Sequence, residues 1–220
     1  MTDEGKLRDP DIREALRDWA MELWPPKKGQ VRHLEEFQFG LGTIADYLIV
    51  RPDVMMGFEI KSDVDSLNRL KVQVPHYNAV CNRLTLVTTW KYANPASRRL
   101  PPHWGIIAAE RGSDGLVKLK VAREGEPTQD EGLGYHPLAM LLLKNDALDY
   151  IMRFSRRDRE MWSRFSSHAL KSIVSDYLSR EEGLHDLAQF VRARILARSK
   201  RAASFDQRTG RSTPRARDTG

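Results

Sequence analysis

The sequence predicts an α/β fold, in which helices flank a mixed central sheet and a helical region follows toward the C-terminus. Residues 44–50 and 55–60 are rich in apolar and β-forming residues, and the Arg51-Pro52-Asp53 turn between them predicts a hairpin. Apolar residues recur at three- and four-residue steps between 12 and 23, which predicts an amphipathic helix before the hairpin. From residue 137 onward the pattern becomes helical.

The N-terminal helix is predicted to begin at Asp9-Pro10, with Asp9 as its N-cap, and to end at Pro25-Pro26. Residues 31–39 alternate in polarity as a strand does, and Gly40-Leu41-Gly42 follows them as a turn. These glycines loosely match a dinucleotide-binding fingerprint. That fingerprint requires a helix directly after the glycines, whereas residues 44–50 are β-rich, so we expect no nucleotide cofactor.

The chain after residue 61 predicts a helix over residues 65–81, capped by Ser62 or Asp63 and kinked by Pro75. Asn94-Pro95 is expected in a loop. Strands are predicted at 83–89, 103–109 and 116–122, the last two as a hairpin, and a linker rich in Gly and Pro spans 124–137. Helices are predicted at 138–144, 147–154, 158–177 and 184–199.

We divide the chain into a core of residues 1–125, a helical region of residues 126–200 packed on or beside it, and a disordered basic tail of residues 201–220. The formal net charge is +6, and residues 151–220 contain sixteen Lys or Arg against eight Asp or Glu. This excess fits phosphate contacts with a nucleic acid, and a solvated helical surface explains it equally well. The single cysteine, Cys81, excludes a disulfide within the chain.

Two acidic residues and a lysine in the predicted hairpin are the sharpest functional signal. Strand side chains alternate between faces, so Glu59 and Lys61 point the same way while Ile60 points into a core. The antiparallel return brings Asp46 beside Glu59. Two carboxylates and an ammonium group on one face suit a divalent cation and a phosphate.

The pattern of Asp46, a spacer and then Glu59-x-Lys61 resembles the PD-(D/E)XK nuclease superfamily, whose fold is restriction-endonuclease-like. Glu36-Phe37 stands where that superfamily often carries an additional acid, and Gln73-x-x-x-Tyr77 is similar to the Gln-Tyr motif of its exonuclease-like branches. The likeness covers residues 31–89 and continues more weakly to residue 151, as in a small bacterial and phage branch. Ala45 departs from the nominal proline before the first acid.

The resemblance implies a role for each residue of the hairpin. Asp46, Glu59 and Ile60 are expected at the metal, and oxygen ligands indicate Mg²⁺ or Mn²⁺. The metal neutralises developing negative charge and makes water nucleophilic. Lys61 is expected to orient or help deprotonate that water and to stabilise the phosphorane.

Additional site residues follow from the same resemblance. Glu36 is expected as a further catalytic and metal-binding acid, with Glu35 as its competitor because alternation sends the two to opposite faces. Gln73 and Tyr77 are expected in the catalytic set and, together with Arg69, in contact with nucleic acid. A polar helix face is an equal alternative for Gln73 and Tyr77.

We therefore expect a divalent-metal-dependent deoxyribonuclease of bacterial or phage DNA metabolism, repair or defence, with DNA preferred over RNA by resemblance alone. The alternatives are a non-catalytic DNA-binding protein that keeps the fold, and a nuclease subunit that depends on a protein partner; a homodimer also stays open. We expect a cytoplasmic location and no membrane association, because the N-terminus lacks a secretory signal and no apolar run has spanning length.

Overall fold

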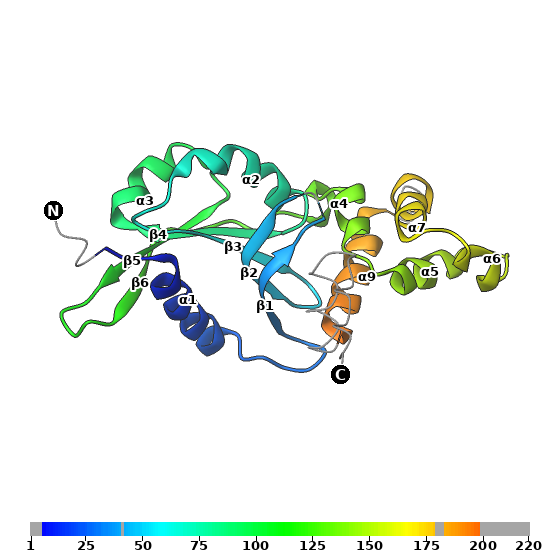
Figure 1. The fold of residues 1–220 in the computed structure, drawn as a ribbon, viewed down its shortest axis with the longest axis horizontal. Helices are drawn as coiled ribbons and strands as arrows, with labels where there is room; N and C mark the ends of the chain where they lie inside the picture. Colours follow the sequence, from blue (N-terminus) through cyan, green and yellow to red (C-terminus); the bar gives the residue numbers. More distant parts are fainter. Residues whose placement is uncertain (1–5, 41, 179–182, 199–220) are drawn as a thin grey trace, which may run out of the picture.

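The computed structural model of the chain describes residues 6–40, 42–178 and 183–198. Its strands are β1 (Arg32–Gln38), β2 (Ile44–Val50), β3 (Met55–Lys61), β4 (Arg83–Thr89), β5 (Gly105–Arg111) and β6 (Val117–Arg123). They form a six-stranded sheet in the order β1-β2-β3-β4-β5-β6 (Figure 1). The sheet is mixed, because β3, β4 and β5 run parallel while the other neighbours are antiparallel. The expected α/β class with a mixed central sheet and flanking helices is confirmed.

Helices cover both faces of this sheet, as Figure 1 shows. α1 (Asp9–Leu23) lies on one face, and α2 (Leu70–Asn78) and α3 (Trp90–Ser97) lie on the other as the crossovers of the parallel strands. The C-terminal helices gather at the β1–β2 end of the sheet. They are α4 (Tyr135–Met140), α5 (Lys144–Met152), α6 (Arg159–Ser163), α7 (Ser167–Ile173), a π-helical turn (Val174–Leu178) and α9 (Leu184–Ala197). No helix in the described part combines the length and apolar character needed to cross a membrane.

Two apolar cores lie on the two faces of the sheet. Ile12 and Leu16 of α1 are fully buried against one face, where they pack with Phe58 and Ile60 of β3. The larger core on the other face runs from the strands through α2 and α3 into the C-terminal helices. Strand alternation therefore sends Glu59 toward α2, on the side opposite α1.

The predicted helix over residues 65–81 is shorter in the structure. The Asp65 carboxylate accepts hydrogen bonds from the backbone N–H (2.8 Å) and Oγ (2.5 Å) of Ser62, which holds a turn in place of the first helical residues. Ser66 is the N-cap instead, and accepts a bond from Asn68 N–H in a 3-10 turn (Leu67–Arg69) before α2 begins. Neither Ser62 nor Asp63 caps the helix, and Pro75 lies inside α2.

Several other boundaries differ from the sequence predictions: α4 and α5 each begin three residues earlier than predicted, β5 begins two residues later and β6 one residue later. Three further differences have a local cause. α1 begins at Asp9, so Arg8 rather than Asp9 is the N-cap. The loop predicted around Asn94-Pro95 is α3, and Pro95 lies near the C-terminal end of that helix. The helix predicted over residues 158–177 is broken, because the Ser166 side chain accepts from Ala169 N–H and starts α7 afresh. The expected disorder of residues 201–220 falls outside the described residues.

A buried ion pair joins α9 to a 3-10 turn (Asp130–Gly132) that follows the sheet. Arg192 is 1% exposed and donates to both carboxylate oxygens of Asp130, at 2.8 and 3.0 Å, and to the carbonyl of Pro52 in the β2–β3 turn at 3.0 Å. Asn82 donates to Asp130 as well, at 2.9 Å. Burial opposes ionisation of Asp130, but its hydrogen bonds with Arg192 and Asn82 outweigh burial and lower its pKa.

We expect Arg192→Met to lower the free energy of unfolding by roughly 3–5 kcal/mol, because it leaves the Asp130 carboxylate buried without its cation. Arg164→Met is the matched control, since Arg164 pairs with Glu160 on the surface and should leave stability unchanged. Urea unfolding at pH 7 measures both. Equal small effects would mean that the buried pair does not anchor α9.

Candidate active site

The site lies where β2 and β3 stop pairing. Their antiparallel register runs from Val50↔Met55 to Tyr47↔Phe58 and ends there. Beyond this point the side chain of Asp46 enters the gap, and its Oδ2 accepts the backbone N–H of Ile60 at 2.7 Å. A carboxylate thus takes the place of a strand carbonyl, which keeps Asp46 against β3 after the ladder has opened.

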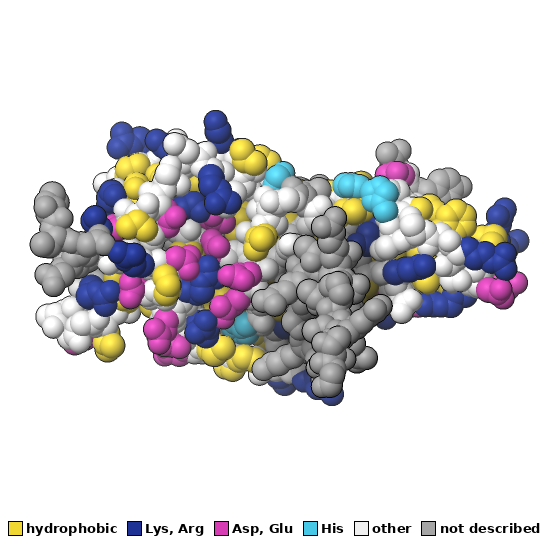
Figure 2. Space-filling view, in the orientation of Figure 1, with side chains coloured by type: hydrophobic (Ala, Val, Ile, Leu, Met, Phe, Trp, Pro, Cys, Tyr) yellow, Lys and Arg dark blue, Asp and Glu magenta, His cyan; other side chains and the backbone are white. Residues whose placement is uncertain are grey.

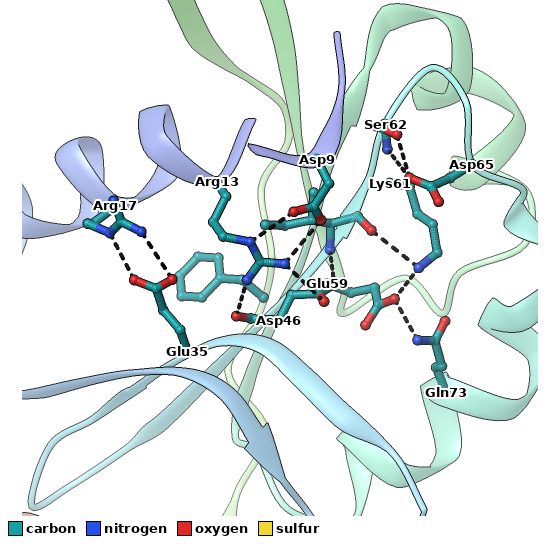
Figure 3. Close-up of polar contacts among 12 residues, drawn as sticks. Asp9, Arg13, Arg17, Glu35, Asp46, Glu59, Lys61, Ser62, Asp65 and Gln73 are labelled. Atoms are coloured by element: carbon teal, nitrogen blue, oxygen red, sulfur yellow. Dashed lines mark hydrogen bonds and ion pairs between the residues drawn. The ribbon is translucent and has the colours of Figure 1, made fainter. Parts of the chain in front are cut away.

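The backbone of Asp46 is also satisfied by side chains. Its N–H donates to the hydroxyl oxygen of Tyr77 in α2 at 3.3 Å, and its carbonyl accepts from Nη1 of Arg13 in α1 at 2.7 Å. Helices from both faces of the sheet therefore hold this one strand residue, as Figure 3 shows for the Arg13 contacts.

Glu59 is buried and its charge is met by three donors. The side chain is 1% exposed; Oε1 accepts from Nε2 of Gln73 at 2.6 Å and Oε2 from the hydroxyl of Tyr77 at 2.8 Å. Lys61 forms an ion pair with Oε1 (Figure 3). Such charge-assisted bonds offset the cost of burying a carboxylate and fix its orientation.

Tyr77 can approach β3 closely because residue 57 is a glycine. A Cβ at Gly57 would lie 2.8 Å from Cδ1 of the Tyr77 ring and 3.0 Å from Sγ of Cys81. Burial and then the charge of Glu59 raise the pKa of Tyr77 well above its usual value. The phenol therefore stays protonated and donates to the carboxylate.

Lys61 ends β3 inside the site and is 6% exposed. Its ammonium also donates to the carbonyl of Ile60 at 3.2 Å, while its own carbonyl accepts from Thr88 Oγ1 at 2.7 Å. Lys61 and Glu59 thus lie on one face, as alternation predicted, and the strand end is tied to β4.

The two acids are close enough to perturb one another. Burial first, and then the charge of Glu59, raise the pKa of Asp46 to about 6, although the Ile60 N–H, Lys61 and Arg13 act in the opposite direction. Burial and the neighbouring acid therefore disfavour the charged form of Asp46 more than its cations and hydrogen bonds favour it.

The structure does not bring the predicted third acid to this pair. Glu36 is exposed and has a left-handed backbone with φ of 50°, which breaks strand alternation, so that Leu34 and Phe37 share one core. Glu35 forms a two-pronged pair with Arg17 of α1, at 2.8 and 3.1 Å. Across residues 6–40, 42–178 and 183–198 no three His, Cys, Asp or Glu side chains gather as metal ligands.

Gln73, Tyr77 and Arg69, which were predicted on one side of a single helix, lie in two different environments in the structure. Gln73 and Tyr77 are buried, 7% and 0% exposed, and both contact Glu59, so the alternative of a solvated polar face is wrong for them. Arg69 is exposed in the preceding 3-10 turn and remains a candidate for surface contact with nucleic acid. The Oε1 atom of Gln73 is buried and, among the described residues, accepts no hydrogen bond.

The donor set suits a hard divalent cation. The carboxylates of Asp46 and Glu59 and the carbonyl of Ile60 are oxygen donors. Burial raises the pKa of Asp46, and repulsion by Glu59 adds to the effect, so a bound cation would favour the charged form. Mg²⁺ is often held in proteins by one or two carboxylates, with water and phosphate oxygens as its other ligands. Two acids are therefore compatible with Mg²⁺ or Mn²⁺ without Glu36.

Sequence reasoning missed the part played by α1. Arg13 donates to Asp46 and to Asp9, yet the helix was expected only to cover the sheet. The available signal was the spacing of Asp9, Arg13 and Arg17 at four-residue steps, which aligns charged side chains along one side of the helix. That pattern is common on solvated helices, so it does not single out a site.

Comparison with known proteins gives a family match along most of the chain. The model of the family described as Bacteriophage P4 protein cII matches residues 3–214. Protein cII of Enterobacteria phage P4 is 25% identical over 122 residues, which cover 54% of this chain and 44% of the relative. The chain thus spans less than half the length of the curated relative it matches.

A solved structure gives a weaker likeness. The SPO1766 protein of unknown function from Silicibacter pomeroyi is 20% identical, and the match covers 54% of this chain and 69% of that chain with a TM-score of 0.36.

We expect Asp46→Asn to stabilise the metal-free protein at pH 8 by about 1–3 kcal/mol and to leave it unchanged at pH 3. A carboxyl whose pKa is raised to about 6 on folding, from 3.8, costs stability as pH rises between these values. Urea unfolding of both proteins at the two pH values measures the difference. The same difference in the free energy of unfolding at pH 3 and pH 8 would contradict the raised pKa of Asp46.

Proposed function

We propose that this chain, which belongs to the Bacteriophage P4 protein cII family, is a divalent-metal-dependent deoxyribonuclease. The observation that carries the proposal is the meeting of Asp46, Glu59 and Lys61 where β2 and β3 separate. The family description states no activity, so the proposal rests on the site and on the resemblance of its motif to PD-(D/E)XK nucleases. Bacterial or phage DNA metabolism, repair or defence is the proposed setting.

Asp46, Glu59 and the carbonyl of Ile60 would hold Mg²⁺ or Mn²⁺, which when bound neutralises phosphate charge and acidifies a bound water. The chain supplies the rest of the chemistry. The ammonium of Lys61, buried beside Glu59, is a fixed positive charge for the attacking water and for the developing oxyanion. Gln73 and Tyr77 hold the Glu59 carboxylate in one orientation, so little rearrangement is needed on metal binding.

A specific observation favours a second candidate, a DNA-binding protein without catalysis. Both carboxylates already have cationic partners, because Lys61 pairs with Glu59 and Nη2 of Arg13 lies 3.4 Å from Asp46. A site neutralised by its own side chains can serve as a scaffold. The two candidates differ in metal binding, which the scaffold does not require.

Lys61→Ala and Asp46→Asn test the proposed chemistry. Asp46→Asn removes a charged ligand, so both Mn²⁺ binding and DNA cleavage should fall. Lys61→Ala keeps the ligands, so Mn²⁺ binding should persist while the cleavage rate falls roughly a hundredfold to a thousandfold. Calorimetric Mn²⁺ titration and cleavage of linear, circular and single-stranded DNA, with a chelator control, measure these effects.

The outcomes separate the candidates. Cleavage by Lys61→Ala at the wild-type rate would reject the assigned centre. DNA binding by the wild type without cleavage in Mg²⁺ or Mn²⁺ would favour the scaffold.

We propose that DNA phosphates contact the basic surface around α6, where Lys and Arg side chains gather in Figure 2. The segment 153–164 carries five exposed arginines against two acids. Arg153, Arg159 and Arg164 pair with carboxylates. Within the described part of the chain, Arg156 and Arg157 form no ion pair, so their charges are available to a polyanion.

We expect the double change Arg156→Gln, Arg157→Gln to weaken DNA binding and to reduce the slope of log K against log salt by about one to two, because fewer counterions are released. The control is Arg98→Gln, Arg99→Gln, a second adjacent pair of exposed arginines, at the end of α3. Its slope should match the wild type in fluorescence anisotropy titrations. Equal slopes for all three proteins would place the phosphate contacts elsewhere.

A further inference from the structure

One side chain of α1 is held rigidly at the edge of the candidate site. Asp9 accepts from Nε of Arg13 at 2.9 Å and from Nη2 at 3.1 Å. This two-pronged contact within one helical turn fixes the plane of the guanidinium group as well as its position. The Arg13 side chain is 16% exposed and that of Asp9 is 39% exposed, so Arg13 is mostly buried while Asp9 remains open to solvent.

The held guanidinium contacts Asp46 at two places. Nη1 donates to the backbone carbonyl of Asp46 at 2.7 Å, and Nη2 lies 3.4 Å from its Oδ1. The other carboxylate oxygen, Oδ2, accepts the N–H of Ile60. Both oxygens and the carbonyl of Asp46 are therefore constrained, by a strand on one side and a helix on the other.

The start of α1 is itself tied to the chain that follows Lys61. Leu7 N–H donates to Oδ2 of Asp63 at 2.9 Å, and Asp63 N–H donates to the carbonyl of Leu7 at 3.0 Å. Asp63 accepts from Thr89 Oγ1 as well, at 2.8 Å. These contacts fix the start of α1 against the ends of β3 and β4, so Arg13 and Asp46 are not free to drift apart.

We propose that Arg13 is a positioning residue, which holds the backbone and carboxylate of Asp46 in the orientation required at the site; its catalytic consequence rests on the proposed nuclease function. Arg13 acts through Asp46, whose carbonyl and carboxylate it contacts. It replaces the strand pairing that Asp46 loses where β2 and β3 separate. The planar fork is essential, because a lysine keeps the charge but cannot contact Asp9 and two atoms of Asp46 together.

The matched pair of variants is Arg13→Lys and Arg17→Lys. Arg17 lies one turn further along α1. Its Nε and Nη2 atoms donate to the Glu35 carboxylate at 2.8 and 3.1 Å, and it does not contact Asp46. Both changes keep the net charge and remove one arginine fork between α1 and an acidic residue. Any difference between them therefore reports the contact with Asp46.

The first readout needs neither metal nor activity. We expect the amide hydrogen of Ile60 to exchange about tenfold faster in metal-free Arg13→Lys, measured by NMR, because its acceptor is no longer held. Arg17→Lys should exchange at the wild-type rate at Ile60. The second readout is DNA cleavage at saturating Mn²⁺, where kcat should fall about tenfold or more in Arg13→Lys and stay unchanged in Arg17→Lys.

Equal exchange at Ile60 in the two variants would overturn the positioning role. A wild-type kcat in Arg13→Lys would show that charge alone matters and would also overturn it. A wild-type protein that cleaves no DNA in Mg²⁺ or Mn²⁺ would reject the proposed function instead, and the exchange rate of Ile60 would still decide whether Arg13 positions Asp46.

Discussion

The separation of β2 from β3 is the constraint on which the candidate site depends. A strand that leaves its neighbour exposes backbone donors and acceptors, and inside a protein each must find another partner. Here the partners are side chains: Asp46 takes the N–H of Ile60, Tyr77 takes the N–H of Asp46, and Arg13 takes its carbonyl. The opening that admits a carboxylate to the sheet is thus maintained by one residue from each flanking helix.

The same arrangement makes ionisation of Asp46 unfavourable. Glu59 is paired with Lys61 and receives two further hydrogen bonds. The Ile60 N–H and the more distant Arg13 only partly offset the burial of Asp46 beside that charge. A packed core on each face of the sheet, centred on α1 and on α2, supplies the stability that this arrangement costs. The pattern is common at functional sites, where local strain is retained because the surrounding fold is rigid.

Local patterns predicted the strands well and the site in part. The bounds of β2 and β4 agree with the prediction, because alternation and β-branched residues are local properties of those segments. The same alternation correctly predicted that the side chains of Glu59 and Lys61 point to one face of the sheet. The left-handed backbone at Glu36 breaks that rule, and no residue type in the sequence announces it.

The misses share one cause, which is that tertiary contacts override local signals. α3 forms despite its proline, and tertiary contacts join its first residues to the loop after β3, since Lys91 donates to the carbonyl of Asp63 and Tyr92 to that of Asp65. Arg13 could not be selected from the sequence, because its partner Asp46 lies 33 residues away. Helix periodicity reports which residues face a core and leaves the partners of the polar ones undetermined.

The Arg192–Asp130 pair has a consequence for the order of folding. Arg192 contacts Pro52 across 140 residues of sequence, Asn82 across 110 and Asp130 across 62, so the partners of this arginine are all synthesised well before it. A nascent chain that has formed its six strands still lacks the arginine that pairs with Asp130, and the apolar face that α9 covers is open. The contact between α9 and the sheet can form only after α9 has been synthesised, and apolar surface that is exposed until then is prone to aggregate.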